Sequence, residues 1–142
     1  MKEFLQQLRH DDIVAAIRDA EKKTSGEIRV FISRKNVDDA VAAAQTQFEK
    51  LGMTRTRLRN GVLIFVAPRT RKFAVIGDTS VHEKCGDAFW QALAAEMSSH
   101  FKKLEFSAGI VHAVHKAGEL LAAHFPRQSD DENELPDQVE HD

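Results

Sequence analysis

Three carboxylates between residues 78 and 87 are the clearest candidates for chemistry in this sequence. Asp78 follows an apolar stretch, and Glu83 and Asp87 come after it, four residues apart. At helical spacing, side chains four residues apart stand side by side on one face. Ca²⁺ and Mg²⁺ prefer carboxylate oxygens as ligands, so Asp78, Glu83 and Asp87 are predicted to bind a divalent cation weakly. Such an ion could polarise a phosphoryl oxygen and activate water, which is the chemistry of a metal-assisted phosphatase.

The same stretch also has a purely structural interpretation. Ser80 and Glu83 fit the S-x-x-E capping box, in which the serine caps a helix start and the glutamate bonds back to the serine amide. Lys84 could relieve the repulsion between Glu83 and Asp87. In that case the segment is only a capped helix start, and both interpretations stay open at this point.

Basic residues on either side of an apolar run form a second candidate site. Residues 54–72 contain no acid. The side chains expected to contact an anion are Arg55, Arg57, Arg59, Arg69 and Arg71. They could bind a phosphorylated small molecule or an acidic protein partner, and solvated loops are the alternative.

Hydrophobic periodicity predicts the elements that position these residues. Helices are expected after Asp11, over 36–51, from Ser80 onward and over 106–125, with strands over 27–33, 61–67 and 73–77. A helix between the first two strands makes them parallel, and a short link makes the last two an antiparallel hairpin. The predicted fold class is α/β: an α/β/α sandwich with a small mixed sheet covered by helices on both faces. In this topology Asp78 and Asp38 lie at opposite rims of the sheet.

Composition limits the classes of protein to which the chain can belong. It has 142 residues, with 20 Lys and Arg against 22 Asp and Glu, and this balance argues against a nucleic-acid binder. Residues 1–126 are predicted to form a single domain, and residues 127–142 an acidic, disordered tail. The single cysteine excludes an internal disulfide, and the sequence shows no signal peptide or membrane span. We therefore expect a cytoplasmic location.

Three short motifs occur in an order and with a spacing that is typical of one family. They are E-x-x-T-x-G-E-I from Glu21, N-G-V-L-I from Asn60, and Gly77 with Glu83 and Asp87 beyond it. Together they resemble the TPM domain, named for thylakoid lumen, photosystem repair and acetylcholine-receptor-modulating proteins. The resemblance covers roughly residues 11–125 and implies an α/β/α sandwich.

The resemblance also implies a range of activities. Some family members are acid phosphatases, and others bind calcium or other divalent cations through acids at one end of the sheet. By position, Glu83 and Asp87 match the family's Glu and Asp after the third strand. The chain departs from the family pattern by lacking a signal peptide and anchor, and by carrying His82 and Cys85 in a segment that is usually rich in glycine.

Two functions of different classes follow from these patterns. The first is a TPM-like domain that binds Ca²⁺ or Mg²⁺ and has phosphatase-type activity. The second is a non-catalytic protein-interaction module that uses the basic loops and the acidic tail. The sequence has no P-loop, nucleophile elbow or H-E-x-x-H motif, which favours the second, whereas the family precedent favours the first.

Overall fold

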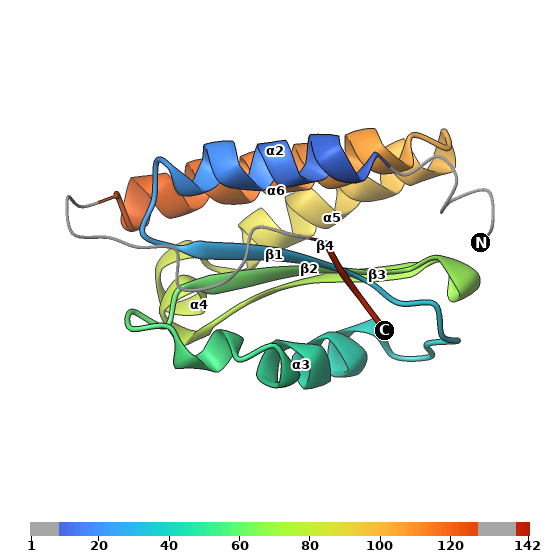
Figure 1. Cartoon of the computed structure of the whole chain (residues 1–142), viewed down its shortest axis with the longest axis horizontal. Coiled ribbons are helices and arrows are strands. Elements are labelled where there is room, and N and C mark those ends of the chain that lie inside the picture. The colour runs from blue at the N-terminus through green and yellow to red at the C-terminus, as the bar shows by residue number, and fades with distance from the viewer. Residues whose placement is uncertain (1–8, 128–138) are drawn as a thin grey trace.

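A computed structural model describes residues 9–127 and 139–142 of the chain. The elements in chain order are α2 (His10–Glu21), β1 (Glu27–Ile32), α3 (Ala40–Lys50), η1 (Met53–Arg55), β2 (Gly61–Ala67), η2 (Pro68–Thr70), β3 (Lys72–Gly77), α4 (Thr79–Cys85), α5 (Asp87–Lys102), α6 (Phe106–His124) and β4 (Val139–His141). Helices α2, α5 and α6 cover one face of the sheet and α3 covers the other (Figure 1). The predicted α/β/α sandwich is therefore confirmed.

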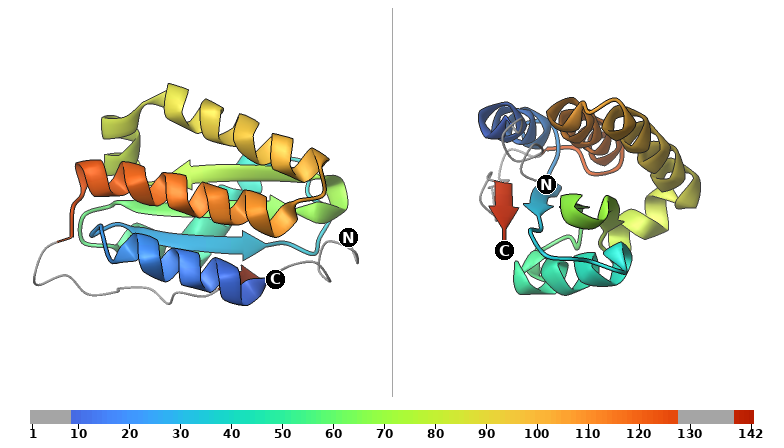
Figure 2. Two further views of the ribbon diagram at one scale, coloured as in Figure 1. Left: turned by 90° about the horizontal axis from the view of Figure 1, so that it is seen from above. Right: turned by 90° about the vertical axis from the view of Figure 1, so that its right-hand side faces the viewer.

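The sheet is mixed, and its strand order is β3-β2-β1-β4. Strands β1 and β2 are parallel, with Glu27 opposite Gly61, and β2 and β3 are antiparallel, with Val62 opposite Gly77. Both pairings agree with the expectation from the link lengths. We use amino rim for the end of the sheet where β1 and β2 begin and β3 ends, and carboxyl rim for the opposite end (Figure 2).

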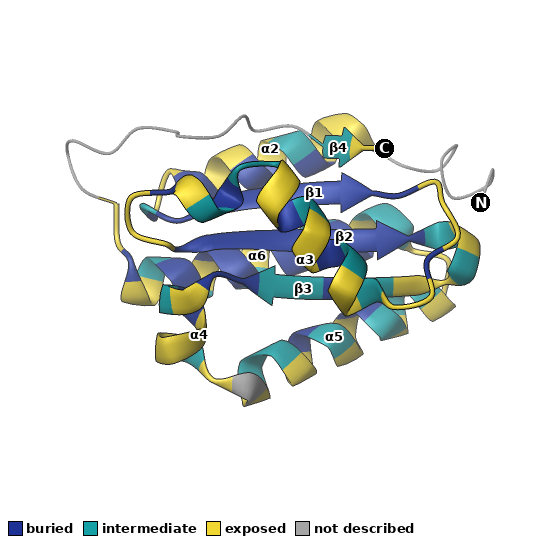
Figure 3. Cartoon of the chain, turned by 90° about the horizontal axis from the view of Figure 1, so that it is seen from below, coloured by how far each residue is buried: buried dark blue, intermediate teal, exposed yellow. Residues whose placement is uncertain are grey.

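Two apolar layers hold the helices on the sheet. Alternation along β1 directs Ile28, Val30 and Ile32 into the larger layer, beneath α2, α5 and α6. Phe31 enters the smaller layer, beneath α3, where its ring stacks on that of Phe65 at 5.6 Å. Every residue of β1 and β2 is buried (Figure 3), so these strands form the rigid centre from which both rims extend.

The helix expected to run on from Ser80 is divided in two. Gly86 lies between α4 and α5 with φ 72° and ψ 173°, a conformation essentially restricted to glycine. No heavy atom lies within 4 Å of the position where a Cβ would be added to Gly86. The chain therefore turns here because of its backbone, and the sequence pattern did not reveal the break.

The segment expected to be a disordered tail differs at its end. Residues 128–138 lie outside the described part of the chain, so disorder there and the boundary at residue 126 stay predictions. Residues 139–141, however, form β4, which pairs in parallel with β1 through Val30 and Val139. This strand was not predicted, because three residues are too few to show a strand periodicity.

Candidate functional site

Asp78 and Arg59 form a bidentate ion pair at the amino rim. Arg59 Nε donates to Asp78 Oδ2 at 2.7 Å and Arg59 Nη2 donates to Asp78 Oδ1 at 2.9 Å. The aspartate is 6% exposed, whereas the arginine side chain is 47% exposed. The hydrogen bonds and charge of Asp78 raise the pKa of the Arg59 guanidinium. One predicted cation ligand is thus paired with one predicted anion contact.

Asp78 also caps helix α4. Its Oδ1 accepts a hydrogen bond from the Thr79 backbone N–H at 2.7 Å, which satisfies one of the free amides at the helix start. Ser80 already lies within the helix, and its N–H donates to the Arg59 carbonyl at 3.3 Å. The expected capping box at Ser80 and Glu83 is therefore wrong. Asp, Thr and Ser are all good caps, so the run D-T-S could not show which of them begins the helix.

Glu83 and Asp87 belong to different helices. Glu83 is exposed in α4, and Asp87 is the first residue of α5, with its side chain outside the described part of the structure. Gly86 turns the chain between the two helices, so the expectation that Glu83 and Asp87 share one helix face is wrong. Binding of a cation by Asp78, Glu83 and Asp87 stays a prediction. Among the described side chains, no three of His, Cys, Asp and Glu gather into a potential metal site.

The predicted arginine contacts divide between the two rims, as expected from their position around β2. Arg55, Arg57 and Arg59 precede β2 at the amino rim, and Arg69 and Arg71 follow it at the carboxyl rim. All five are exposed. They do not converge on one site, and their contact with an anion stays a prediction.

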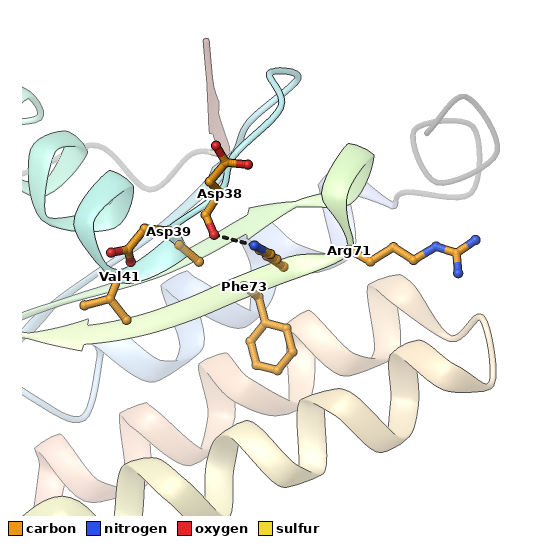
Figure 4. Close-up of a pocket in the computed structure, with 7 residues that line it drawn as sticks. Asp38, Asp39, Val41, Arg71 and Phe73 are labelled. Atoms are coloured by element: carbon orange, nitrogen blue, oxygen red, sulfur yellow. Dashed lines mark hydrogen bonds between the residues drawn. The ribbon is translucent and has the colours of Figure 1, made fainter.

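A pocket of about 520 Å³ opens at the carboxyl rim, near the start of α3. Its lining includes Asp38, Asp39, Arg71 and Lys72 (Figure 4). Lys72 Nζ donates to the Asp38 carbonyl, while the Arg71 side chain extends away from both acids. Asp39 caps α3 by accepting from the Ala42 N–H at 3.1 Å. Lys72 and Asp39 are therefore used within the fold.

The outer edge of β1 holds a buried ion pair that sequence reasoning missed. Arg29 is only 4% exposed, and its Nη2 donates to Glu140 of β4. A buried guanidinium requires an anionic partner, because leaving it without one costs several kcal/mol. The available signal was the arginine within the apolar run E-I-R-V-F-I, where a charge in a fully buried strand requires a partner.

Asp142 forms the second acidic contact at this edge. Ser33 Oγ donates to Asp142 Oδ2 at 2.6 Å, and the Arg34 backbone N–H donates to Oδ1 at 2.7 Å. Burial acts to raise the pKa of Asp142, but these two hydrogen bonds and the charge of Lys35 outweigh it, so the pKa lies below its ordinary value. The edge of β1 thus stabilises the ionised form of this acid.

The first family motif forms the turn between α2 and β1. Glu21 is buried, and its Oε2 accepts from the Ile28 N–H at 2.7 Å. Thr24 Oγ1 donates to the Phe125 carbonyl and accepts from the Gly26 N–H at 3.0 Å. These contacts connect the start of β1 to the end of α6, so the motif has a structural explanation that needs no ligand.

Comparison with known proteins agrees with this architecture. The model of the TPM domain matches residues 1–120 of the chain. The chain belongs to the TPM domain family. The NMR structure of the BA42 protein from the psychrophilic bacterium Bizionia argentinensis is similar to this TPM domain, with a TM-score of 0.87 and 39% identity over 96% of each chain. No curated protein matched. In the part of this TPM domain that the structure describes, no helix has both the length and the apolar character to cross a membrane.

Proposed function

We propose that this TPM domain is a protein-interaction module that accepts an acidic, extended segment as an added strand at the edge of β1. The buried pair of Arg29 with Glu140 is the observation that carries the proposal. Arg29 belongs to the folded sheet, whereas Glu140 belongs to a three-residue strand that is separated from α6 along the chain. The Arg29 guanidinium at the sheet edge therefore requires a carboxylate partner. Glu140 of β4 provides that carboxylate.

The contacts at this edge are those of strand addition. Backbone pairing brings Val139, Glu140 and His141 beside β1, and such pairing gives affinity without regard to sequence. Selectivity comes from the side chains, because Arg29 donates a hydrogen bond to the carboxylate of Glu140 and Ser33 donates one to that of Asp142. The two acids are two residues apart and so share one side of the strand. The recognised pattern is acid–x–acid in an extended segment.

The alternative, a Ca²⁺ or Mg²⁺ site at Asp78, Glu83 and Asp87 with phosphatase-type chemistry, has less support. Both oxygens of Asp78 already accept hydrogen bonds from Arg59. An ion would therefore have to displace a bidentate guanidinium from a buried carboxylate, and doing so would cost the ion pair and its hydrogen bonds.

A labelled peptide of residues 134–142 tests the interaction module. We expect it to bind a chain ending at Arg127 and to bind the full chain much more weakly, because β4 already occupies the edge. Fluorescence anisotropy measures both affinities. A peptide with Glu140→Gln should bind at least about tenfold more weakly, since Arg29 then stays buried without an anion. The matched control peptide is Asp137→Asn, which changes an acid that precedes β4.

Two results would overturn the proposal. One is failure of the peptide to bind a shortened chain that circular dichroism shows to be folded. The other is equal affinity for the wild-type and Glu140→Gln peptides. Should the shortened chain not fold, the full chain with Glu140→Gln and Asp142→Asn replaces it, because its own tail no longer competes well. Added wild-type peptide should then bind this variant more tightly than it binds the wild-type chain.

A further inference from the structure

Leu104 has an unfavourable backbone conformation and an exposed side chain. Its φ is +61°, and it is 62% exposed. The Glu105 N–H donates to the His100 carbonyl at 2.9 Å, and the Leu104 N–H donates to the Phe101 carbonyl at 3.0 Å. This is the Schellman end of a helix, in which the position of Leu104 is usually a glycine. Stability alone would favour glycine here, so the leucine requires another explanation.

A pocket of about 580 Å³ lies beside Leu104, a volume within the range of small-ligand sites. We name it the Phe73 pocket; its apolar lining includes Phe73, Phe101, Leu104 and Phe106. The rings of Phe73 and Phe101 meet edge to face at 5.4 Å, and those of Phe101 and Phe106 are 5.9 Å apart. Leu104 therefore places an apolar group at the rim of an aromatic pocket.

The charged residues that line the Phe73 pocket are all positive. Arg71, Lys72 and Lys102 contribute to its lining, and no Asp or Glu does among the described residues. Lys72 Nζ is engaged with the Asp38 carbonyl. Within residues 9–127 and 139–142, the charged ends of Arg71 and Lys102 have no ion pair or hydrogen bond, and Arg71 extends out past the end of the sheet (Figure 4). Two cations are thus available for an anionic group.

We propose that the Phe73 pocket binds a small amphiphilic carboxylate, such as a medium-chain acyl or aryl-alkyl acid. The apolar body lies among the three phenylalanines, and Leu104 covers it from the rim. The carboxylate of the ligand lies at the mouth of the Phe73 pocket, within the positive electrostatic field of Lys102 and Arg71. This ligand accounts for both the exposed leucine and the absence of acidic side chains from the lining. The proposal does not depend on strand addition at β1, which lies two strands away.

Decanoate is the probe, with decyltrimethylammonium as an amphiphile of similar tail length and opposite charge. Both are titrated below their micelle concentrations into the full, ¹⁵N-labelled chain. We expect decanoate to shift the amide signals of Phe73, Phe101 and Leu104, and to bind several-fold more tightly than the cation. Equal affinity for the two probes, shifts spread over the whole chain, or no shift at millimolar decanoate would each overturn the proposal.

Paired variants separate ligand contacts from stability. Leu104→Gly should raise the melting temperature by a few degrees and weaken decanoate binding several-fold, whereas Leu58→Ala, at another exposed leucine, should leave binding unchanged. Lys102→Gln should weaken the binding of decanoate but not of the cationic probe. The neighbouring Lys103→Gln should weaken the binding of neither probe. If Leu104→Gly is more stable and binds decanoate as well as the wild type does, the leucine has no part in a site and the proposal is wrong.

Discussion

The carboxylate of Asp78 connects three segments that are separate in the sequence. It pairs with Arg59 before β2, it follows the last residue of β3, and it caps α4. The ion pair and the helix cap both use the carboxylate oxygens of Asp78, so these oxygens already have partners within the fold. This arrangement makes Asp78 the residue that best separates a structural role from cation binding.

Asp78→Ala should lower the free energy of unfolding by about 2–3 kcal/mol, because it removes a helix cap and a buried, charged hydrogen-bond acceptor. Asp78→Asn retains an oxygen for the cap and should cost less. Urea denaturation measures both, and Glu83→Ala, an exposed acid of the same helix, should change stability by no more than about 0.5 kcal/mol. The cation hypothesis predicts something different: millimolar Ca²⁺ should stabilise the wild type, and Asp78→Asn should abolish that effect.

Sequence reasoning singled out Asp78, which the structure places in an ion pair and a helix cap, but not the residues of the β1 edge. An acid directly after a strand is visible in any sequence, since its position depends only on local pattern. Arg29 and Glu140 are 111 residues apart, and nothing local indicates that they meet. Arg59 was visible as a basic residue, but its pairing with Asp78 depends on how β2 and β3 align.

At the scale of elements, the break between α4 and α5 determines what the segment after β3 can do. The apolar spacing of the helix continues well enough on both sides to suggest a single helix. Only the backbone at Gly86 ends it, with φ 72° and ψ 173°. Periodicity reports which face is buried and not the dihedral angles of one glycine, so this break could not be predicted.

Gly86→Ala and Gly86→Asn should both lower stability by about 1–3 kcal/mol, although there is free space for a side chain. Gly52 provides the matched control. Its φ of 74° and ψ of 18° lie in the left-handed region that asparagine also adopts, so Gly52→Asn should cost clearly less. Thermal unfolding compares the four proteins. A more stable Gly86→Ala would show that α4 and α5 can join into the continuous helix expected from the sequence.

At the scale of the whole molecule, the topology was the most predictable property. Link lengths between strands were sufficient for the parallel and antiparallel pairs, and the alternation of β1 and the continuous apolar run of β2 gave both apolar layers. The addition of β4 was not predictable, because its place depends on charge pairing across the folded sheet. The prediction that residues 127–142 form a disordered tail is therefore wrong for residues 139–141, which form β4.

A chain ending at Arg127 should lose about 3 kcal/mol of stability, since it loses both the ion pair of Arg29 with Glu140 and the pairing of β4 with β1. Arg29→Met should recover part of this loss in the shortened chain, because methionine removes the unpaired charge and keeps the volume. The same substitution should destabilise the full chain, because Glu140 then loses its ion pair with Arg29. Chemical denaturation of the four proteins measures the coupling. Equal effects of Arg29→Met in both backgrounds would show that the tail and Arg29 are independent.

The late position of Glu140 has a consequence during translation. Synthesis proceeds from the amino terminus, so β4 emerges from the ribosome after every other described strand. Until then, the nascent chain presents the open edge of β1, and open edges are the surfaces through which unfinished proteins aggregate. A positive charge at the centre of that edge disfavours pairing with the same edge of a neighbouring nascent chain. We therefore expect Arg29 to disfavour such pairing until Glu140 has been synthesised and neutralises its charge.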